Sequence, residues 1–167
     1  STFILGPDVE LFEDKFSKLI NCKYSIGVNS GTDALIIALK ALDIGPGDEV
    51  ITVPNSYVAT AQAISLVGAK PVFVDVDSYT MNMDLKKVQN EINSNTKAII
   101  PVHLFGFPVD IFKLRKIVGD SINIVEDCAQ SHGAKVGEHL TGSMGDVNCF
   151  SLHPAKVLAS LGDSGVI

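Results

Sequence analysis

Short apolar segments alternate with longer segments of helical periodicity along almost the whole of this chain. The apolar segments are about four to six residues long and rich in Val and Ile, which is typical of buried strands. They lie at 49–53, 71–74, 97–102, 122–125 and 147–152. Helices are expected between them, at 8–19, 33–42, 54–67, 84–92 and 109–118. This alternation predicts an α/β protein, a three-layer αβα sandwich around a mostly parallel sheet.

Three segments fall outside this simple alternation. Residues 22–28 are short and favour a strand, and residues 133–145 are polar and rich in glycine, which predicts a small hairpin or a loop. Residues 165–167 are apolar and read as the beginning of a further strand, which would need a continuation and a neighbour. We therefore expect the chain to be part of a longer polypeptide.

Composition excludes several classes of protein. The chain is 46% hydrophobic and 19% charged, with a net charge of −6, which argues against a nucleic-acid surface. No apolar run reaches about 18 residues, so no membrane span is expected. Cys22, Cys128 and Cys149 stand far apart and form no disulfide pattern, which favours reduced thiols in a cytoplasmic protein.

The residues that could bind a ligand or take part in a reaction fall just past the ends of predicted strands. They are Ser30 to Thr32, Ser56 and Tyr57, Asp127, Gln130, and Ser151 to Lys156. In parallel sheets, ligands bind at the carboxyl ends of the strands. These residues are therefore expected to surround one ligand, and their types suit a flat, phosphorylated ring that contains nitrogen.

The segment Ser30-Gly31-Thr32 stands at a junction between a strand and a helix. Free N–H groups and the helix dipole make such a junction an anion site, and Gly31 would let a phosphate come close. Ser151 could donate to the same phosphate. The alternative is that Ser or Thr only caps the helix.

Tyr57 and Asp127 could bind two different parts of a ring. Tyr57 could offer a stacking face, although an ordinary half-buried tyrosine is the alternative. Asp127 follows a buried strand, and its carboxylate could pair with a protonated pyridine nitrogen. Its alternative is to cap the following turn. Gln130 could then reach the phenolic oxygen of the ring.

Lys156 lies between apolar neighbours beyond the last of the buried strands, where its amine could bond covalently to the ring. The alternative is a solvated surface lysine. His103 and His153 are assigned no catalytic role, and no metal-ligand spacing is present.

In their order along the chain, the motifs resemble those of the DegT/StrS family. The resemblance extends from Gly6-Pro7 to Gly162-Asp163 and rests on Ser30-Gly-Thr-Asp-Ala-Leu35, Pro71-Val-Phe-Val-Asp75-Val, Pro101-Val-His-Leu-Phe-Gly106, Glu126-Asp-Cys-Ala-Gln-Ser-His-Gly133 and Phe150-Ser-Leu-His-Pro-Ala-Lys156. Members of this family are nucleotide-sugar aminotransferases that use pyridoxal 5'-phosphate (PLP) and have the fold-type I architecture of aspartate aminotransferase.

The resemblance implies a role for each matching residue. Lys156 matches the lysine that forms a Schiff base with PLP, and Asp127 matches the partner of the pyridine nitrogen. Gln130 matches the residue that contacts the 3-hydroxyl of the ring, and Tyr57 matches the stacking position. Gly31, Thr32 and Ser151 match the phosphate site.

The resemblance also implies a reaction and an assembly. An amino group would pass from an amino acid, expected to be glutamate, to a keto-deoxysugar nucleotide, in amino-sugar biosynthesis for surface polysaccharide or natural products. Family members are homodimers with shared active sites and are more than twice as long. Residues 1–167 would thus be an incomplete cofactor-binding large domain, and the carboxyl-terminal small domain would be missing.

Three alternatives stay open on the same scaffold: a PLP-dependent sugar dehydratase, a cyclitol aminotransferase and a non-catalytic regulatory relative. One branch of the family carries histidine in place of the lysine and dehydrates its substrate, so Lys156 favours an aminotransferase. Ser164 stands where the family usually has glycine.

Overall fold

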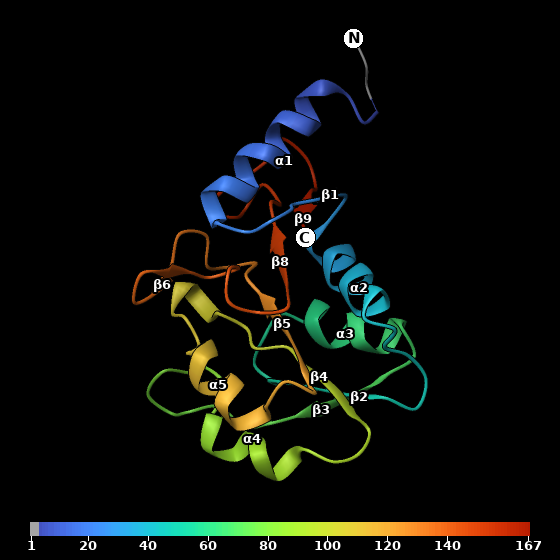
Figure 1. The fold of residues 1–167 in the computed structure, drawn as a ribbon, viewed down its shortest axis with the longest axis vertical. Coiled ribbons are helices and arrows are strands. Elements are labelled where there is room, and N and C mark those ends of the chain that lie inside the picture. Colours follow the sequence, from blue (N-terminus) through green and yellow to red (C-terminus); the bar gives the residue numbers. More distant parts are fainter. Residues whose placement is uncertain (1–3) are drawn as a thin grey trace.

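A seven-stranded sheet forms the middle layer of the protein, seen in a computed structural model that describes residues 4–167 (Figure 1). The strand order is β1-β9-β8-β5-β4-β2-β3. Strand β9 is antiparallel to both of its neighbours, and all other neighbouring pairs are parallel. The predicted α/β architecture with a mostly parallel sheet is confirmed. The strands are β1 (Gly27–Val28), β2 (Glu49–Thr52), β3 (Lys70–Phe73), β4 (Thr96–Ile99), β5 (Asn123–Asp127), β8 (Val147–Ser151) and β9 (Gly165–Val166).

Helices cover both faces of this sheet (Figure 1). Helices α2 (Gly31–Ala41) and α3 (Ala59–Leu66) pack on one face, and α4 (Leu85–Glu91) and α5 (Ile111–Val118) pack on the other. Helix α1 (Pro7–Ile20) lies on the face opposite α2, where Phe16 meets the ring of Phe150 edge to face with centroids 5.0 Å apart. The short 3₁₀ helix η1 (Leu104–Gly106) follows β4, and the predicted hairpin consists of β6 (Lys135–Val136) and β7 (His139–Leu140).

The two faces of each strand belong to two different cores. Ala98 on β4 and Ile100 directly after it pack under α2 and α3, while Ile99 on β4 packs under α4 and α5. Successive side chains of a strand point to opposite faces, so a strand covered on both sides is apolar at most of its positions. This is why the strands appeared in the sequence as continuous apolar runs.

Several predicted boundaries differ from the structure. The helix expected from residue 54 begins at Ala59, because residues 54–58 form a turn that carries Tyr57 outward. The strand expected over 97–102 ends at Ile99, and the one expected in 22–28 covers only Gly27–Val28. Asp127 and Ser151 are the last residues of β5 and β8 rather than residues beyond them.

No helix in the described residues 4–167 combines the length and the apolar composition that a membrane span requires.

Candidate functional site

A cavity of about 370 Å³ lies at the carboxyl ends of β1, β2, β5 and β8. All seven residues that the sequence singled out for the site line this cavity: Gly31, Thr32, Tyr57, Asp127, Gln130, Ser151 and Lys156. They come from four different connections and are brought together by the parallel order of the strands. Their individual roles stay predictions.

The first turn of α2 forms one end of the cavity. The Oγ of Ser30 accepts a hydrogen bond from the N–H of Asp33 at 3.0 Å, so the capping alternative holds for Ser30. Gly31 has a steric role as well as the expected one. A Cβ at this position would lie 2.5 Å from the Cβ of Ser151, so only glycine allows α2 to approach β8 this closely.

Thr32, on α2, and Ser151, at the end of β8, both line the cavity. In the described part of the chain, the hydroxyl of Thr32 has no hydrogen-bond partner. Two hydroxyls beside the first turn of a helix, close to its positive dipole end, suit an anion such as a phosphate.

Asp127 forms another wall of the cavity and is only 5% exposed. Its Oδ2 accepts a hydrogen bond from the Oγ1 of Thr60 at 2.8 Å, and its Oδ1 accepts one from the N–H of Ala129 at 3.1 Å. The turn-capping alternative therefore holds for one oxygen only. No Lys, Arg or His among residues 4–167 forms an ion pair with Asp127.

Burial raises the pKa of the Asp127 carboxyl, although the hydrogen bonds from Thr60 and Ala129 act in the opposite direction. A buried carboxylate without an ion-pair partner is unfavourable. A ligand that brings a positive charge to this oxygen pair would relieve that cost.

Tyr57 is 71% exposed and sits on the turn before α3, so the half-buried alternative is wrong. Its ring lines the cavity and is open to a planar ligand. Gln130 is oriented by the backbone, since its Oε1 accepts a hydrogen bond from the N–H of Phe105 at 2.9 Å. This bond leaves the NH₂ group of Gln130 as the donor available to a ligand.

Lys156 lies five residues beyond the end of β8 and is half-buried. Its backbone N–H donates to the carbonyl of His153 at 2.8 Å, which makes the turn that directs the side chain to the cavity. Within the described residues, no side chain or carbonyl hydrogen-bonds the amine of Lys156.

Sequence reasoning missed several residues of this cavity, and Thr60 is the most informative of them. Thr60 lies on the first turn of α3 and contacts Asp127, from which it is 67 positions away in the chain. Its position four residues after Ser56, on a helix, was an available signal. The other missed lining residues are Leu35, Ala59, Val102, Ala129 and Asp163, and His153, which was considered without a role, also lines the wall.

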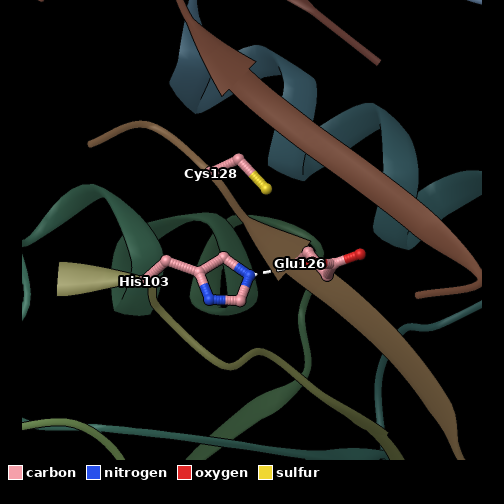
Figure 2. Close-up of side chains that lie close together, drawn as sticks. All are labelled: His103, Glu126 and Cys128. Atoms are coloured by element: carbon pink, nitrogen blue, oxygen red, sulfur yellow. Dashed lines mark hydrogen bonds and ion pairs between the residues drawn. The ribbon is translucent and has the colours of Figure 1, made fainter. Parts of the chain in front are cut away.

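A second polar cluster lies on the opposite face of β5 and is completely buried. It consists of His103, Glu126 and Cys128, as Figure 2 shows, and their ligand-type atoms lie within 4.8 Å of one another. The N–H of Val109 donates to Nδ1 of His103 at 2.9 Å, so the ring proton is on Nε2 and points to Oε2 of Glu126, 2.8 Å away. The histidine in this pair is therefore neutral.

Glu126 is satisfied by protein donors alone. Besides His103, its oxygens accept hydrogen bonds from the N–H groups of Gly142, Met144 and Gly145, at 3.0, 2.7 and 2.6 Å. Burial raises the pKa of this carboxyl, but the bonds from His103 and the backbone outweigh it and lower the pKa. Burial also raises the pKa of the Cys128 thiol. A metal ion would have to displace these bonds, so the cluster serves the structure.

Taken together, the cavity presents an anion site at one end, a buried carboxylate at another wall, a free aromatic face and an unpartnered amine. This donor set fits a flat ring that carries a phosphate, a basic nitrogen and a group that reacts with amines.

Comparisons with known proteins show which proteins the chain is similar to. The profile of the DegT/DnrJ/EryC1/StrS aminotransferase family matches residues 1–167. The chain is 44% identical over 168 residues to the UDP-N-acetyl-3-dehydro-alpha-D-glucosamine 3-aminotransferase of Acidithiobacillus ferrooxidans, covering 100% of this chain and 46% of that protein. It thus spans about half the length of the curated relatives that it matches.

Solved structures agree with this assignment. The crystal structure of DesV from S. venezuelae in complex with a ketimine intermediate matches with a TM-score of 0.94 and 42% identity, covering 97% of this chain and 44% of that one. The structure of NtdA from Bacillus subtilis with bound cofactor PMP matches with a TM-score of 0.90 and 35% identity, covering 96% of this chain and 36% of that one.

Proposed function

Because the chain belongs to the DegT/DnrJ/EryC1/StrS aminotransferase family, we propose that its protein is a PLP-dependent aminotransferase acting on nucleotide-linked keto sugars. The amino donor is an amino acid, and glutamate is the expected one. The products serve amino-sugar biosynthesis for polysaccharide or natural products, which accords with the sugar transaminases among the relatives.

The residues present in the cavity fit PLP. Thr32, Ser151 and the first turn of α2 would hold its phosphate, Tyr57 would cover the ring, and Gln130 would donate to the ring oxygen. When bound, this cofactor supplies an aldehyde that reacts with amines and a ring that takes up electron density from the substrate carbon.

Asp127 and Lys156 perform the reactive tasks. Asp127 would hold a proton on the ring nitrogen by its negative charge, which the dry surroundings strengthen. Lys156 would hold the cofactor through its amine and would accept and return a proton at its Nζ. The observation that carries the proposal is that a buried carboxylate without an ion-pair partner and an amine without a hydrogen-bond partner share one cavity.

We further propose a cytoplasmic homodimer whose partner subunit completes the substrate side. Large apolar side chains next to the cavity support this, since Val58 is 63% exposed and Val157 is 80% exposed. Exposed apolar groups around a site are typical of surfaces that another chain covers. Residues 1–167 would then be the cofactor-binding large domain, and a carboxyl-terminal small domain would complete the protein.

The first prediction tests the lysine. In the full-length protein, addition of PLP is expected to produce an absorption band near the visible edge, and borohydride should then fix the cofactor covalently to Lys156. Lys156→Ala should lose both the band and the attachment, which peptide mass spectrometry measures. Lys135→Ala, at an exposed position on β6 outside the cavity, is the matched control and should keep both.

The proposal fails if wild-type protein shows no band with added PLP. Product analysis separates the remaining possibilities, because an aminated keto-sugar nucleotide, an aminated keto-inositol and a dehydrated sugar are different compounds. A protein that binds PLP and yields none of the three would be the regulatory relative.

A further inference from the structure

Two hydroxyl groups stand in series behind the carboxylate of Asp127. The Oγ1 of Thr60 lies 2.8 Å from Oδ2 of Asp127, and the Oγ of Ser56 lies 3.0 Å from the same Oγ1. Thr60 is 2% exposed, so water does not replace either contact easily. The three residues come from the turn before α3, from α3 itself and from the end of β5.

The direction of these hydrogen bonds follows from counting protons. An ionised carboxylate can only accept, so Thr60 must donate its single hydroxyl proton to Asp127. The oxygen of Thr60 then has only lone pairs left, and Ser56 must be the donor in the second bond. Ser56 therefore donates to Thr60 and Thr60 donates to Asp127, and each hydrogen bond strengthens the next.

We propose that Thr60 is a positioning residue that fixes the orientation of the Asp127 carboxylate and stabilises its charge for the ring nitrogen of the cofactor. This inference rests on the proposed function. Thr60 holds Oδ2 while the N–H of Ala129 holds Oδ1 from another side, so the two donors together define the rotation of the carboxylate.

Ser56 extends this arrangement to the aromatic face of the site. It directly precedes Tyr57 on the turn before α3, and its bond to Thr60 ties that turn to α3. The chain of hydroxyls thus links the group that would cover the ring to the group that would face its nitrogen. Loss of Thr60 is expected to disturb both.

Cofactor affinity is the first measurement. Titration of cofactor-free full-length protein with PLP should show binding at least about tenfold weaker in Thr60→Val, since hydrogen bonds to charged groups are the strong ones. Thr60→Ser keeps the hydroxyl and should stay within about threefold of wild type. Equal affinity of wild type and Thr60→Val, or a Thr60→Ser variant as weak as Thr60→Val, overturns the inference.

The pH dependence of stability separates a charge effect from loss of packing. Without the Thr60 donor, the folded-state pKa of Asp127 rises further, and stability from such a group is lost as pH rises through that value. In cofactor-free protein, the loss of thermal stability in Thr60→Val should therefore grow from pH 4 to pH 8. The other titratable groups around Asp127 are His103, Lys156, Cys128 and Cys149, and they are the same in every variant.

Thr96→Val is the matched control, because Thr96 is also buried and its hydroxyl accepts from the N–H of Asn93 far from the cavity. The loss of thermal stability in Thr96→Val should not vary between pH 4 and pH 8. If the loss in Thr60→Val is equally independent of pH, the inference is overturned.

If Thr60→Val does not fold, the Ser56→Ala variant provides the test. Its PLP binding is expected to be about two- to fivefold weaker than that of wild type, and unchanged binding would contradict the inference. If wild-type protein binds no PLP, the proposed function fails, while the pH series still tests the bond between Thr60 and Asp127.

Discussion

At the scale of the residue, a few close contacts between individual atoms fix the geometry of the site. Gly31 and Ser151 lie far apart in the sequence, yet a methyl group on Gly31 has no room beside Ser151. Both Asp127 oxygens are likewise held by one donor each. Chemistry that needs a fixed ring depends on such contacts, because a small displacement of a reacting group lowers the rate strongly.

The second prediction concerns the steric requirement at Gly31. Gly31→Ala should lower the free energy of unfolding by about 1–3 kcal/mol, because the added Cβ overlaps the backbone and side chain of Ser151. PLP binding should weaken in parallel as α2 moves away from β8. Urea denaturation measures the first effect and a PLP titration measures the second.

Gly162→Ala provides the control for this experiment, since a Cβ there meets nothing within 4 Å. Its stability should stay within about 0.5 kcal/mol of wild type. A Gly31→Ala variant as stable as Gly162→Ala would show that α2 and β8 are not in tight contact.

At the scale of the element, β5 performs three tasks in five residues. Ile124 and Val125 bury their side chains in the two cores, Glu126 binds the segment before β8, and Asp127 enters the cavity. The alternation of a strand places Glu126 and Asp127 on opposite faces. The carboxylate of Glu126 thus stabilises the fold, and the carboxylate of Asp127 belongs to the site.

The third prediction tests the scaffold role of Glu126. Glu126→Gln places an NH₂ group against N–H donors, which are either the backbone N–H of Gly142 and the ring N–H of His103, or the backbone N–H groups of Met144 and Gly145. Because donors then face donors, the variant should lose about 2–3 kcal/mol of stability at pH 7. Urea denaturation measures this loss, and Glu138→Gln, at an exposed position, should change little.

The same carboxylate should make the protein sensitive to acid. The folded-state pKa of Glu126 is lowered, so its contribution is present above the unfolded value, near 4.3, and is lost as pH falls through the folded value. The difference between wild type and Glu126→Gln should therefore shrink when denaturation is repeated below pH 4. A difference independent of pH would contradict the ionised state of Glu126.

At the scale of the whole molecule, the strand order creates the cavity. Strand β1 is followed directly by α2, and only β9 separates β1 from β8 in the sheet, so the start of α2 reaches the end of β8. Strands β5 and β2 add Asp127 and the turn of Tyr57 from the same edge of the sheet. Binding at this edge should therefore stabilise several elements at once.

The fourth prediction follows from that coupling. PLP at about 100 times its dissociation constant should raise the free energy of unfolding of the full-length protein by about 2.7 kcal/mol. Thermal denaturation with and without PLP measures the effect, and removal of the cofactor by dialysis should reverse it. Pyridoxal, which lacks the phosphate, is the control and should stabilise much less at the same concentration. Equal effects would argue against an anion site at α2.

The sequence predicted the elements well and their ends less well. Periodicity located every helix and strand of the sandwich, because burial on one or two faces leaves a regular apolar pattern. It misplaced the start of α3, because residues 54–58 are compatible with either a helix or a turn, and their neighbours in space decide between the two. Thr60 was missed for a similar reason, since its partner lies on β5.

By itself, the sequence determined the α/β class, the family and seven of the residues around the cavity, because apolar periodicity and ordered motifs are local properties. Only the tertiary structure decided how these residues meet. It showed that Gly31 is required by Ser151, that Ser56 and Thr60 support Asp127, and that Glu126 binds the scaffold rather than a ligand. Such contacts join residues that are distant in the chain, and packing of the sheet and helices alone brings them together.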